Sequence, residues 1–369
     1  MAHIVLDTRI IETSTGRYMQ RLLEHINDTY AEQDGHRYTA LVPSQHVDKW
    51  QARLPHIAVV GADQKWYTFA EQWSLYWQLR GLKPDLVHFT MPQQPLLWRG
   101  PAVTTIHDVT LIRFDNIAPG ENALIYRIKQ RIFHSLLRVV MRRARAVLTP
   151  TEFVRRDLGE FFGRTYLEKI HVTPLAGEIP DVDPEPLPDY VDKDFLLVVG
   201  NGFPYKNVWR VIEGFALLKQ AHPDLHLLIA GKKDAFYQAI EQRALEANIS
   251  DIHFLGFITD GEKRWALQNA KVYVTASYSE GFCMPVLEAM IEGCPVVSSN
   301  ASCLPEVVGD AGLLFDPDSA AELVAAVEKI LASDDLRQSL IAKGREHAGS
   351  YSWARMVKQA HNVYLSILK

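Results

Sequence analysis

Residues 195–207 have the sequence FLLVVGNGFPYKN, in which five apolar residues lead into a glycine turn. A near-continuous apolar run of this length is typical of a strand that is buried on both faces of a parallel sheet. Residues 207–220, which follow the turn, carry apolar side chains at helical spacing. A strand, a turn and a helix in this order predict a doubly wound α/β fold.

The same alternation of strand and helix extends along the whole chain. In the first half we expect strands at residues 3–7, 85–89, 102–106 and 146–149, and helices at about 16–29, 68–81 and 121–145. In the second half we expect strands at 195–200, 225–231, 252–256, 272–276 and 295–298, and helices near 207–220, 234–247, 261–269, 285–293 and 319–331. Two parallel sheets, each covered by helices on both faces, are the simplest assembly of these elements.

A change in composition marks a boundary between two domains, which a chain of 369 residues is long enough to form. From residue 174 to 194 the chain contains five prolines and seven acidic residues, which resist both helix and strand. We therefore expect an N-terminal domain at 1–175, a linker at 176–194 and a C-terminal domain at 195–351. A long surface loop inside one domain is the alternative. Residues 352–369 predict an amphipathic helix that packs back on the N-terminal domain.

The overall composition excludes several classes of protein. The net charge is −5, which argues against a nucleic-acid-binding protein. The sequence predicts neither a signal peptide nor a membrane span. Its cysteines, Cys283, Cys294 and Cys303, form no CxxC pair, so we expect no disulfide framework and no structural zinc site. Free thiols favour a cytoplasmic protein.

The segment SEGFCMPVLEAMIEGCP, residues 279–295, follows an expected strand. Ligands bind in loops at the carboxyl ends of parallel strands, and a helix that starts near Pro285 would point its first backbone N–H groups at a phosphate. Gly281 permits a close approach of the backbone. Glu280 and Glu288 would place two carboxylates beside this pocket. A helix-capping Glu280 and a solvated Glu288 are the structural alternative.

Glu280 and Glu288 have seven residues between them, and this spacing resembles the EX7E motif of retaining glycosyltransferases. Together with LPEVVGDAGLLFDP at residues 304–317, the segment is similar to glycosyltransferase family 4. The resemblance covers nearly the whole chain and is strongest from residue 195 to 317. It implies the GT-B fold, in which two Rossmann-like doubly wound α/β domains face a cleft. It also implies a retaining hexosyltransferase that uses a nucleotide-diphosphate sugar.

The resemblance also implies roles for individual residues near this motif. Glu288 would hold the ribose of the donor nucleotide, and Glu280 would act as a catalytic residue that contacts the hydroxyls of the transferred sugar. The loop after the strand at 252–256 would contact the nucleobase. The residues expected to line the sugar, the diphosphate and the nucleobase are Gly281, Phe282, Cys283, Met284, Pro285, Phe257 and Ile258.

The turn GNGFPYKN, residues 200–207, contains a second candidate catalytic residue, Lys206. Negative charge grows on a departing diphosphate, and a fixed cation lowers the energy of that transition state. Asn201, Gly202 and Asn207 of the same turn are expected to contact the donor. Similar enzymes often have an arginine at the position of Asn201, so charge compensation here would depend on Lys206, the backbone and another basic residue.

The segment VTTIHDVT, residues 103–110, ends an expected strand with His107. A histidine that caps the strand end is the structural alternative. The family resemblance implies a catalytic His107 that contacts the donor sugar across the cleft between the domains, with Asp108 orienting the ring or the loop. Gly16 corresponds to a glycine-rich loop beside the diphosphate and the acceptor, in which Ser14 replaces a frequent glycine.

The expected helix at 121–145 is strongly basic. From residue 127 onward it carries seven arginine and lysine residues and no acid, with apolar residues interleaved. A solvated amphipathic helix is one interpretation. The other is that this helix binds peripherally to the anionic inner face of the cell membrane, or that it binds a lipid-diphosphate acceptor.

Three DxD triplets, at 181–183, 192–194 and 316–318, match a spacing that holds a divalent metal in a different transferase fold. The first two lie in the acidic linker, and Asp318 precedes a helix that it could cap. We interpret all three as structural. We therefore expect a metal-independent enzyme that has no cofactor besides its nucleotide-sugar co-substrate.

The residues and the resemblance together predict the transfer of a sugar from GDP-mannose or a UDP-sugar to a glycan or lipid-linked acceptor in cell-surface polysaccharide synthesis. Two alternatives stay open. A nucleotide-sugar epimerase or a phosphorolytic enzyme of the same fold would turn over the donor without an alcohol acceptor. A catalytically silent subunit would bind the nucleotide sugar without releasing a nucleoside diphosphate.

Overall fold

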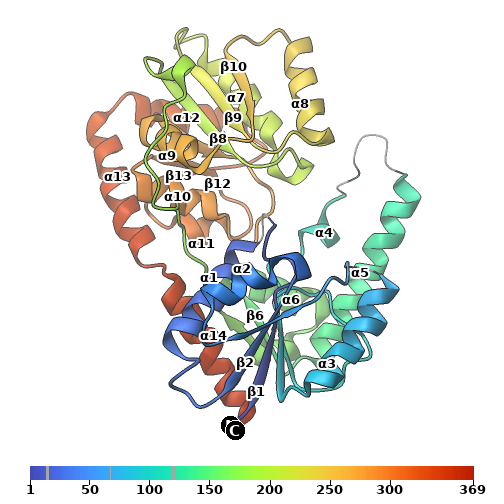
Figure 1. Ribbon diagram of the computed structural model, residues 1–369. Coiled ribbons are helices and arrows are strands. Elements are labelled where there is room, and N and C mark those ends of the chain that lie inside the picture. The colour runs from blue at the N-terminus through green and yellow to red at the C-terminus, as the bar shows by residue number, and fades with distance from the viewer. Residues whose placement is uncertain (14–15, 67, 116, 118–121) are drawn as a thin grey trace. The chain divides into compact units, whose positions relative to one another are not determined.

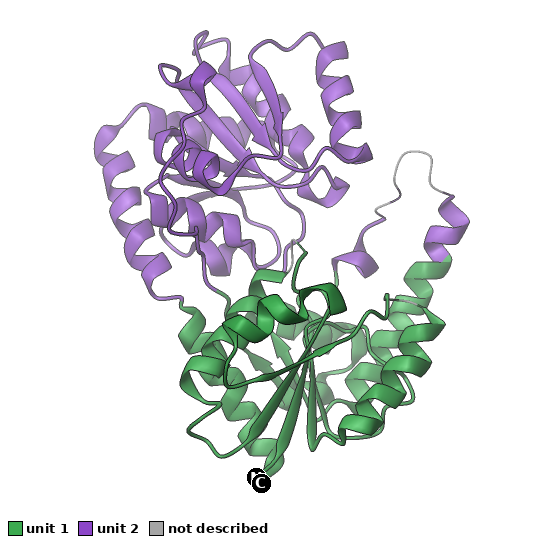
Figure 2. Cartoon of the chain, in the orientation of Figure 1, with its two compact units in different colours: residues 1–109, 128–175, 352–369 green, residues 110–127, 176–351 purple. Residues whose placement is uncertain are grey.

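The computed structural model describes residues 1–13, 16–66, 68–115, 117 and 122–369 (Figure 1). The chain forms two compact units, each built around a parallel sheet of its own (Figure 2). Unit 1 comprises residues 1–109, 128–175 and 352–369, and unit 2 comprises residues 110–127 and 176–351. Two Rossmann-like doubly wound α/β domains are the fold class that the sequence predicts, and this prediction is confirmed.

Unit 1 contains seven parallel strands in the order β3-β2-β1-β4-β5-β6-β7. They are β1 (His3–Asp7), β2 (Arg37–Val42), β3 (Ala58–Gly61), β4 (Leu86–Phe89), β5 (Ala102–Thr105), β6 (Ala146–Thr149) and β7 (Ile170–Val172). Its helices are α1 (Gly16–Thr29), α2 (Val47–Arg53), α3 (Tyr76–Leu82), α6 (Glu152–Phe162), α14 (Trp353–Leu368) and most of α5 (Ala123–Arg143). The strand order reverses between β1 and β4, and ligands bind at the carboxyl ends of strands beside such a reversal.

Unit 2 contains six parallel strands in the order β10-β9-β8-β11-β12-β13. They are β8 (Phe195–Val199), β9 (His226–Ala230), β10 (Ile252–Gly256), β11 (Val272–Thr275), β12 (Val296–Ser299) and β13 (Gly312–Phe315). Its helices are α4 (Thr110–Arg113), α7 (Val208–Leu218), α8 (Ala235–Glu246), α9 (Asp260–Asn269), α10 (Met284–Glu292), α11 (Leu304–Val308), α12 (Ala320–Leu331) and α13 (Asp334–Gly349). In the described parts of the chain, no helix has both the length and the apolar character that crossing a bilayer requires.

The strands that the sequence predicts all form, and four further strands do so as well: β2, β3, β7 and β13. Three of these four, β3, β7 and β13, lie at the edges of the sheets. An edge strand has only one neighbouring strand, and the side chains of β3 and β13 are mostly half-buried. Their sequences therefore lack the long apolar run that distinguishes a central strand.

The predicted range of the N-terminal domain, 1–175, differs from unit 1 at residues 110–127, which group with unit 2. Two side-chain contacts within unit 2 account for this. Thr110 Oγ1 lies 2.9 Å from Ser279 Oγ, and the ring of Phe114 stacks on that of Tyr278 with centroids 6.2 Å apart. A helical pattern in the sequence contains no signal for contacts of this kind, which join residues distant in the chain.

The last helix, α14, completes the core of unit 1. The hydroxyl of Tyr364 lies 2.5 Å from Nδ1 of His88, and Nε2 of His88 lies 2.8 Å from the hydroxyl of Thr105. All three residues are buried. Burial and the nearby His107 lower the pKa of His88 to about 3, so its ring is neutral and each ring nitrogen has one hydroxyl partner. One turn earlier, the ring of His361 stacks on that of Tyr30.

We expect Tyr364→Phe to lower the free energy of unfolding by about 1–3 kcal/mol, because the buried Nδ1 of His88 would lose its partner. Urea denaturation of the full chain measures this difference. Tyr166→Phe is the matched control: it also removes one phenolic oxygen from unit 1, at a half-buried ring, and should change the stability by less than about 0.5 kcal/mol. Equal losses in the two variants would contradict a specific role for the Tyr364–His88 contact.

Candidate functional site

The candidate site of unit 2 lies at the carboxyl ends of β8 and β11. After β8 the backbone turns through Gly200 and Gly202, and side chains would not fit at Gly202 or at Gly231, which follows β9. A Cβ atom on Gly202 would lie 2.5 Å from the backbone nitrogen of Tyr237, and one on Gly231 would lie 1.7 Å from the carbonyl oxygen of Gly200. The glycines therefore let the turn pack directly against the start of α8 and the end of β9.

A buried ion pair joins this turn to the loop after β11. Lys206 Nζ lies 2.6 Å from Glu280 Oε1, and the Lys206 side chain is 20% and the Glu280 side chain 9% exposed. The hydroxyl of Ser277 donates a second hydrogen bond to the same carboxylate oxygen, at 2.7 Å. The structure thus brings together Lys206 and Glu280, which the sequence analysis selected independently from two different segments.

Backbone contacts fix the two loops that carry the ion pair. The N–H of Tyr278 donates to the carbonyl oxygen of Tyr205 at 2.7 Å, so the loop after β11 is tied to the turn after β8. The N–H of Glu280 donates to the hydroxyl of Ser302, which follows β12, at 3.0 Å. Three neighbouring strands, β8, β11 and β12, therefore position Glu280.

The electrostatics of the site are dominated by this pair. Burial alone would lower the pKa of Lys206, but the adjacent Glu280 carboxylate outweighs it, so the pKa of Lys206 is raised and the ammonium is charged at neutral pH. Burial and the same carboxylate raise the pKa of the Cys283 thiol, which is therefore neutral. Asn201 lines a small cavity with Lys206, Ser277 and Cys283. Its side-chain oxygen accepts from the N–H of Phe203 at 3.4 Å.

The helix α10 begins directly beside the ion pair. Cys283 precedes it with a left-handed backbone, φ 71°, and Pro285 occupies its first turn. Because proline has no N–H, Pro285 supplies no backbone donor in this first turn. Phe282 is buried and packs edge-on against Tyr351, and Gly281 and Met284 flank this short segment.

Glu288 lies further along α10 and is buried rather than solvated. Its Oε2 lies 3.2 Å from Nζ of Lys263, a residue of α9 that also lies 3.4 Å from Asp260. The sequence analysis did not select Lys263. Its pairing with Glu288 joins α9 to α10, and the two residues are too far apart in the sequence for a local spacing to predict the contact.

Three further candidate residues of unit 2, Phe257, Ile258 and Asn207, follow the carboxyl ends of β10 and β8. Gly256 ends β10 with φ 71°, and the ring of Phe257 is 87% exposed, with Ile258 next to it half-buried. Asn207 has a left-handed backbone, φ 51°, and its side-chain N–H donates to the carbonyl oxygen of Pro317 at 2.9 Å.

His107 and Gly16 belong to unit 1. His107 is half-buried, with Nε2 3.3 Å from the carbonyl oxygen of Thr90 and the ring of Tyr18 edge-on at 4.9 Å. Burial lowers its pKa against the opposing effect of Asp108, so its ring is neutral at neutral pH. A Cβ atom on Gly16 would lie 1.9 Å from the carbonyl oxygen of Ile11. Ser14 lies outside the described residues.

The expected capping role of Asp318 is wrong. The residue that caps α12 is Ser319, whose hydroxyl accepts from the N–H of Glu322. Asp318 instead accepts a hydrogen bond from the hydroxyl of Tyr278 at 2.6 Å. The linker carboxylate Asp181 is fully exposed and lies 3.7 Å from Arg264.

We expect Lys206→Met to lower the free energy of unfolding by about 1–3 kcal/mol, because the buried Glu280 would lose its counter-ion. Glu280→Gln should cost a similar amount, since it leaves the lysine without a carboxylate. The double variant should be more stable than the sum of the two losses by about 0.5–3 kcal/mol. Urea denaturation of the four proteins measures this coupling, and strictly additive losses would show that the pair contributes nothing.

Comparisons with known proteins cover both units. Residues 181–347 match the family described as Glycosyl transferases group 1, and residues 16–176 match the family described as Glycosyltransferase Family 4. The chain is 30% identical to O-antigen chain mannosyltransferase B of Escherichia coli over 304 residues, which cover 78% of this chain and 76% of that protein.

Two further proteins extend these comparisons. The phosphatidyl-myo-inositol mannosyltransferase of Mycolicibacterium smegmatis is 25% identical over 296 residues, 77% of this chain and 71% of that protein. The solved structure of Anabaena Alr3699/HepE in complex with UDP-glucose is similar in fold, with a TM-score of 0.72 at 17% identity over 99% of this chain and 100% of that one.

Proposed function

We propose that this chain, which belongs to glycosyltransferase family 4 and is a hexosyltransferase, binds a nucleotide-diphosphate sugar at the Lys206–Glu280 pair of unit 2. The acceptor would be a glycan or a lipid-linked glycan of a cell-surface polysaccharide. Mannose is the sugar we favour, because two relatives are named as mannosyltransferases, which makes GDP-mannose the first donor to test and UDP-sugars the second.

The ion pair supports this proposal because it supplies a fixed positive charge within a buried, hydrogen-bonded setting. A diphosphate that leaves the sugar gains negative charge in the transition state, and a preorganised cation stabilises that charge without reorganisation. Lys206 is held by Glu280 and Tyr205 lies beside it. Asn201 is uncharged, so the positive charge that an arginine would add at that position is absent here. Its side-chain oxygen accepts a hydrogen bond from the backbone of its own turn.

The reaction we propose retains the configuration at the anomeric carbon. The bond from that carbon to the diphosphate oxygen breaks while a bond to the acceptor oxygen forms on the same face, and the acceptor proton passes to the departing diphosphate. In this scheme Glu280 binds hydroxyls of the sugar and Glu288 binds the ribose. The loop after β10, with Phe257 exposed and Ile258 half-buried, would contact the nucleobase. The role of His107 stays a prediction, as does the absence of a catalytic metal.

We expect Glu280→Gln to reduce kcat/KM for sugar transfer by at least about 100-fold, because the neutral amide removes the negative charge that pairs with Lys206 and has one acceptor oxygen instead of two. Release of nucleoside diphosphate from GDP-mannose and from UDP-glucose measures this, with and without a lipid-linked glycan acceptor. Glu246→Gln, at an exposed position of α8, is the control and should keep full activity.

The same assay separates the alternatives. Turnover of the donor without acceptor would favour an epimerase or a phosphorolytic enzyme. Binding of the donor without release of nucleotide, for every acceptor tested, would favour a silent subunit. Full transfer activity in Glu280→Gln would refute the site.

The helix α5 supports a further part of the proposal, peripheral association with the inner face of the cell membrane. Four apolar side chains of α5 are about half exposed or more: Leu124 at 67%, Ile125 at 51%, Ile128 at 48% and Ile132 at 56%. Leu124, Ile128 and Ile132 follow one another at intervals of four residues and lie on one face of the helix. Basic residues flank this face, as in helices that lie in a membrane interface.

A basic cavity of unit 1 adjoins the end of the same helix. Its volume is about 490 Å³, and no carboxylate is found among the described residues that line it. Its basic side chains are Arg99, Arg142, Arg143, Arg145 and Lys169. Burial and the neighbouring charges of Arg99 and Arg142 lower the pKa of Arg143. This accumulation of positive charge suits the phosphate of an anionic lipid.

We expect the full chain to sediment with vesicles that contain acidic phospholipid, and to be released by salt. Replacing Ile128 and Ile132 together by serine should weaken binding several-fold, because it removes apolar area from the interface. Leu245→Ser, at a 66% exposed position of α8, is the control and should bind like the unchanged protein. An absence of salt-sensitive binding would refute the membrane association.

A further inference from the structure

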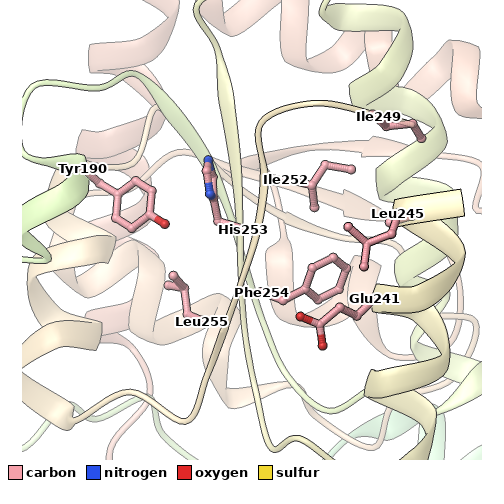
Figure 3. Close-up of a pocket in the computed structure, with 9 residues that line it drawn as sticks. Tyr190, Glu241, Leu245, Ile249, Ile252, His253, Phe254 and Leu255 are labelled. Carbon is pink, nitrogen blue, oxygen red and sulfur yellow. The ribbon is translucent and has the colours of Figure 1, made fainter. Parts of the chain in front are cut away.

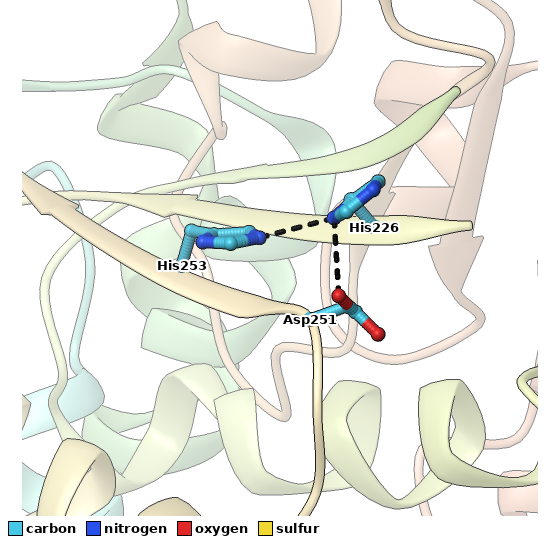
Figure 4. A group of neighbouring side chains, drawn as sticks. All are labelled: His226, Asp251 and His253. Carbon is cyan, nitrogen blue, oxygen red and sulfur yellow. Dashed lines mark hydrogen bonds and ion pairs between the residues drawn. The ribbon is translucent and has the colours of Figure 1, made fainter. Parts of the chain in front are cut away.

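Two histidines and an aspartate of unit 2 converge at the amino ends of β9 and β10 (Figure 4). His226 begins β9, His253 lies in β10, and Asp251 directly precedes β10. His226 Nδ1 lies 3.1 Å from His253 Nε2 and 3.6 Å from Asp251 Oδ1. All three side chains are half-buried.

The separations between these atoms suit a tetrahedral divalent ion. Zinc is bound at about 2.0–2.1 Å from imidazole nitrogen and at a similar distance from carboxylate oxygen, so two tetrahedral ligand atoms lie about 3.3 Å apart. The two measured separations lie on either side of that value. All three ligand atoms lie within 4.8 Å of one another. The fourth position of the tetrahedron would be left to water.

The surroundings of Asp251 hold its carboxylate in place. Its backbone is left-handed, φ 60°, a conformation that aspartate adopts more readily than most residues. Lys219 Nζ lies 2.7 Å from Oδ2, so the other oxygen, Oδ1, faces His226. A hydrogen bond to the free oxygen of a ligating carboxylate is the usual support of a metal ligand.

The charges around the two imidazoles also fit a cation. Both imidazoles are half-buried beside the carboxylate of Asp251, and a divalent ion binds imidazole through a ring nitrogen that carries no proton. The charged groups that act on them include the ammonium groups of Lys193 and Lys219 and the carboxylates of Asp189, Asp224 and Asp251. These five groups carry three negative and two positive charges.

We propose that His226, Asp251 and His253 bind a divalent transition-metal ion, with Zn²⁺ as the ion to test first. Two imidazoles and one carboxylate are a ligand set that suits Zn²⁺ and its late first-row neighbours better than Mg²⁺ or Ca²⁺. These three residues match neither the cysteine patterns nor the DxD triplets of the sequence. The helix α8 separates His226 in β9 from Asp251 and His253 at the start of β10, so no local spacing joins them.

The position of the group indicates a structural role for the ion rather than a catalytic one. It lies at the amino ends of the strands, whereas Lys206, Glu280 and Gly256 lie at the carboxyl ends. β10 is an edge strand, and a cavity of about 270 Å³ adjoins it (Figure 3). In that view His253 and Tyr190 lie on one side of β10 and Phe254 on the other. An ion held by His226 and His253 would tie this edge strand to β9.

The test uses the full chain without a polyhistidine tag, treated with a chelator and then titrated with Zn²⁺ or Co²⁺ in the absence of nucleotide. We expect Zn²⁺ to raise the melting temperature, because the ion binds only the folded arrangement. Bound Co²⁺ should give the strong visible absorption of tetrahedral coordination. His253→Gln and Asp251→Asn should each weaken binding of Zn²⁺ at least about tenfold.

Asp251→Asn keeps the left-handed backbone accessible, so its loss of binding would not reflect a misfolded turn. His56→Gln is the matched control, since His56 of unit 1 pairs with the carboxylate of Glu32 at 3.0 Å and belongs to no group of three possible ligands among the described residues. It should bind Zn²⁺ like the unchanged protein. No rise in melting temperature with Zn²⁺, or an equal rise in His253→Gln, would overturn the proposal.

Discussion

The buried pair of Lys206 and Glu280 is the interaction on which the candidate site depends. A carboxylate that is withdrawn from water needs a counter-ion and hydrogen-bond donors, and Glu280 has both in Lys206 and Ser277. The two charged residues are far apart in the sequence and meet because β8 and β11 are neighbours in one parallel sheet. The glycine turn, the tie between Tyr278 and Tyr205 and the start of α10 all serve to hold these two side chains in one place.

An incoming diphosphate would meet a lysine that already has a carboxylate partner. In enzymes with an additional arginine nearby, the diphosphate has a second cation to bind. Here the residue at that position is the uncharged Asn201, whose side chain accepts a hydrogen bond from its own turn. The diphosphate would therefore compete with Glu280 for Lys206. The sugar hydroxyls that bind Glu280 would at the same time replace part of the hydrogen bonding that Lys206 gives it. In the proposed binding mode, a single ion pair would therefore couple the binding of the two parts of the donor.

The sequence predicts most of the strands that are buried on both sides, although it does not predict the central strand β2. Central strands such as β8 and β11 have continuous apolar runs, whereas the edge strands β3, β7 and β13 are half-exposed and carry no such signal. The candidate site divides in the same way. Glu280 and Glu288 lie in one segment and have a readable spacing, but Lys263 reaches Glu288 from another helix. The group of His226, Asp251 and His253 likewise depends on strand register, which a single sequence does not reveal.

The return of α14 to unit 1 has a consequence for the synthesis of the protein on the ribosome. The first 109 residues emerge early, but the helix that supplies the partner of His88 is translated after all of unit 2. Unit 2 has all of its residues available before that helix leaves the exit tunnel. The order of completion is therefore the reverse of the order in which the two sheets begin, and the core of the N-terminal sheet closes only after α14 has emerged.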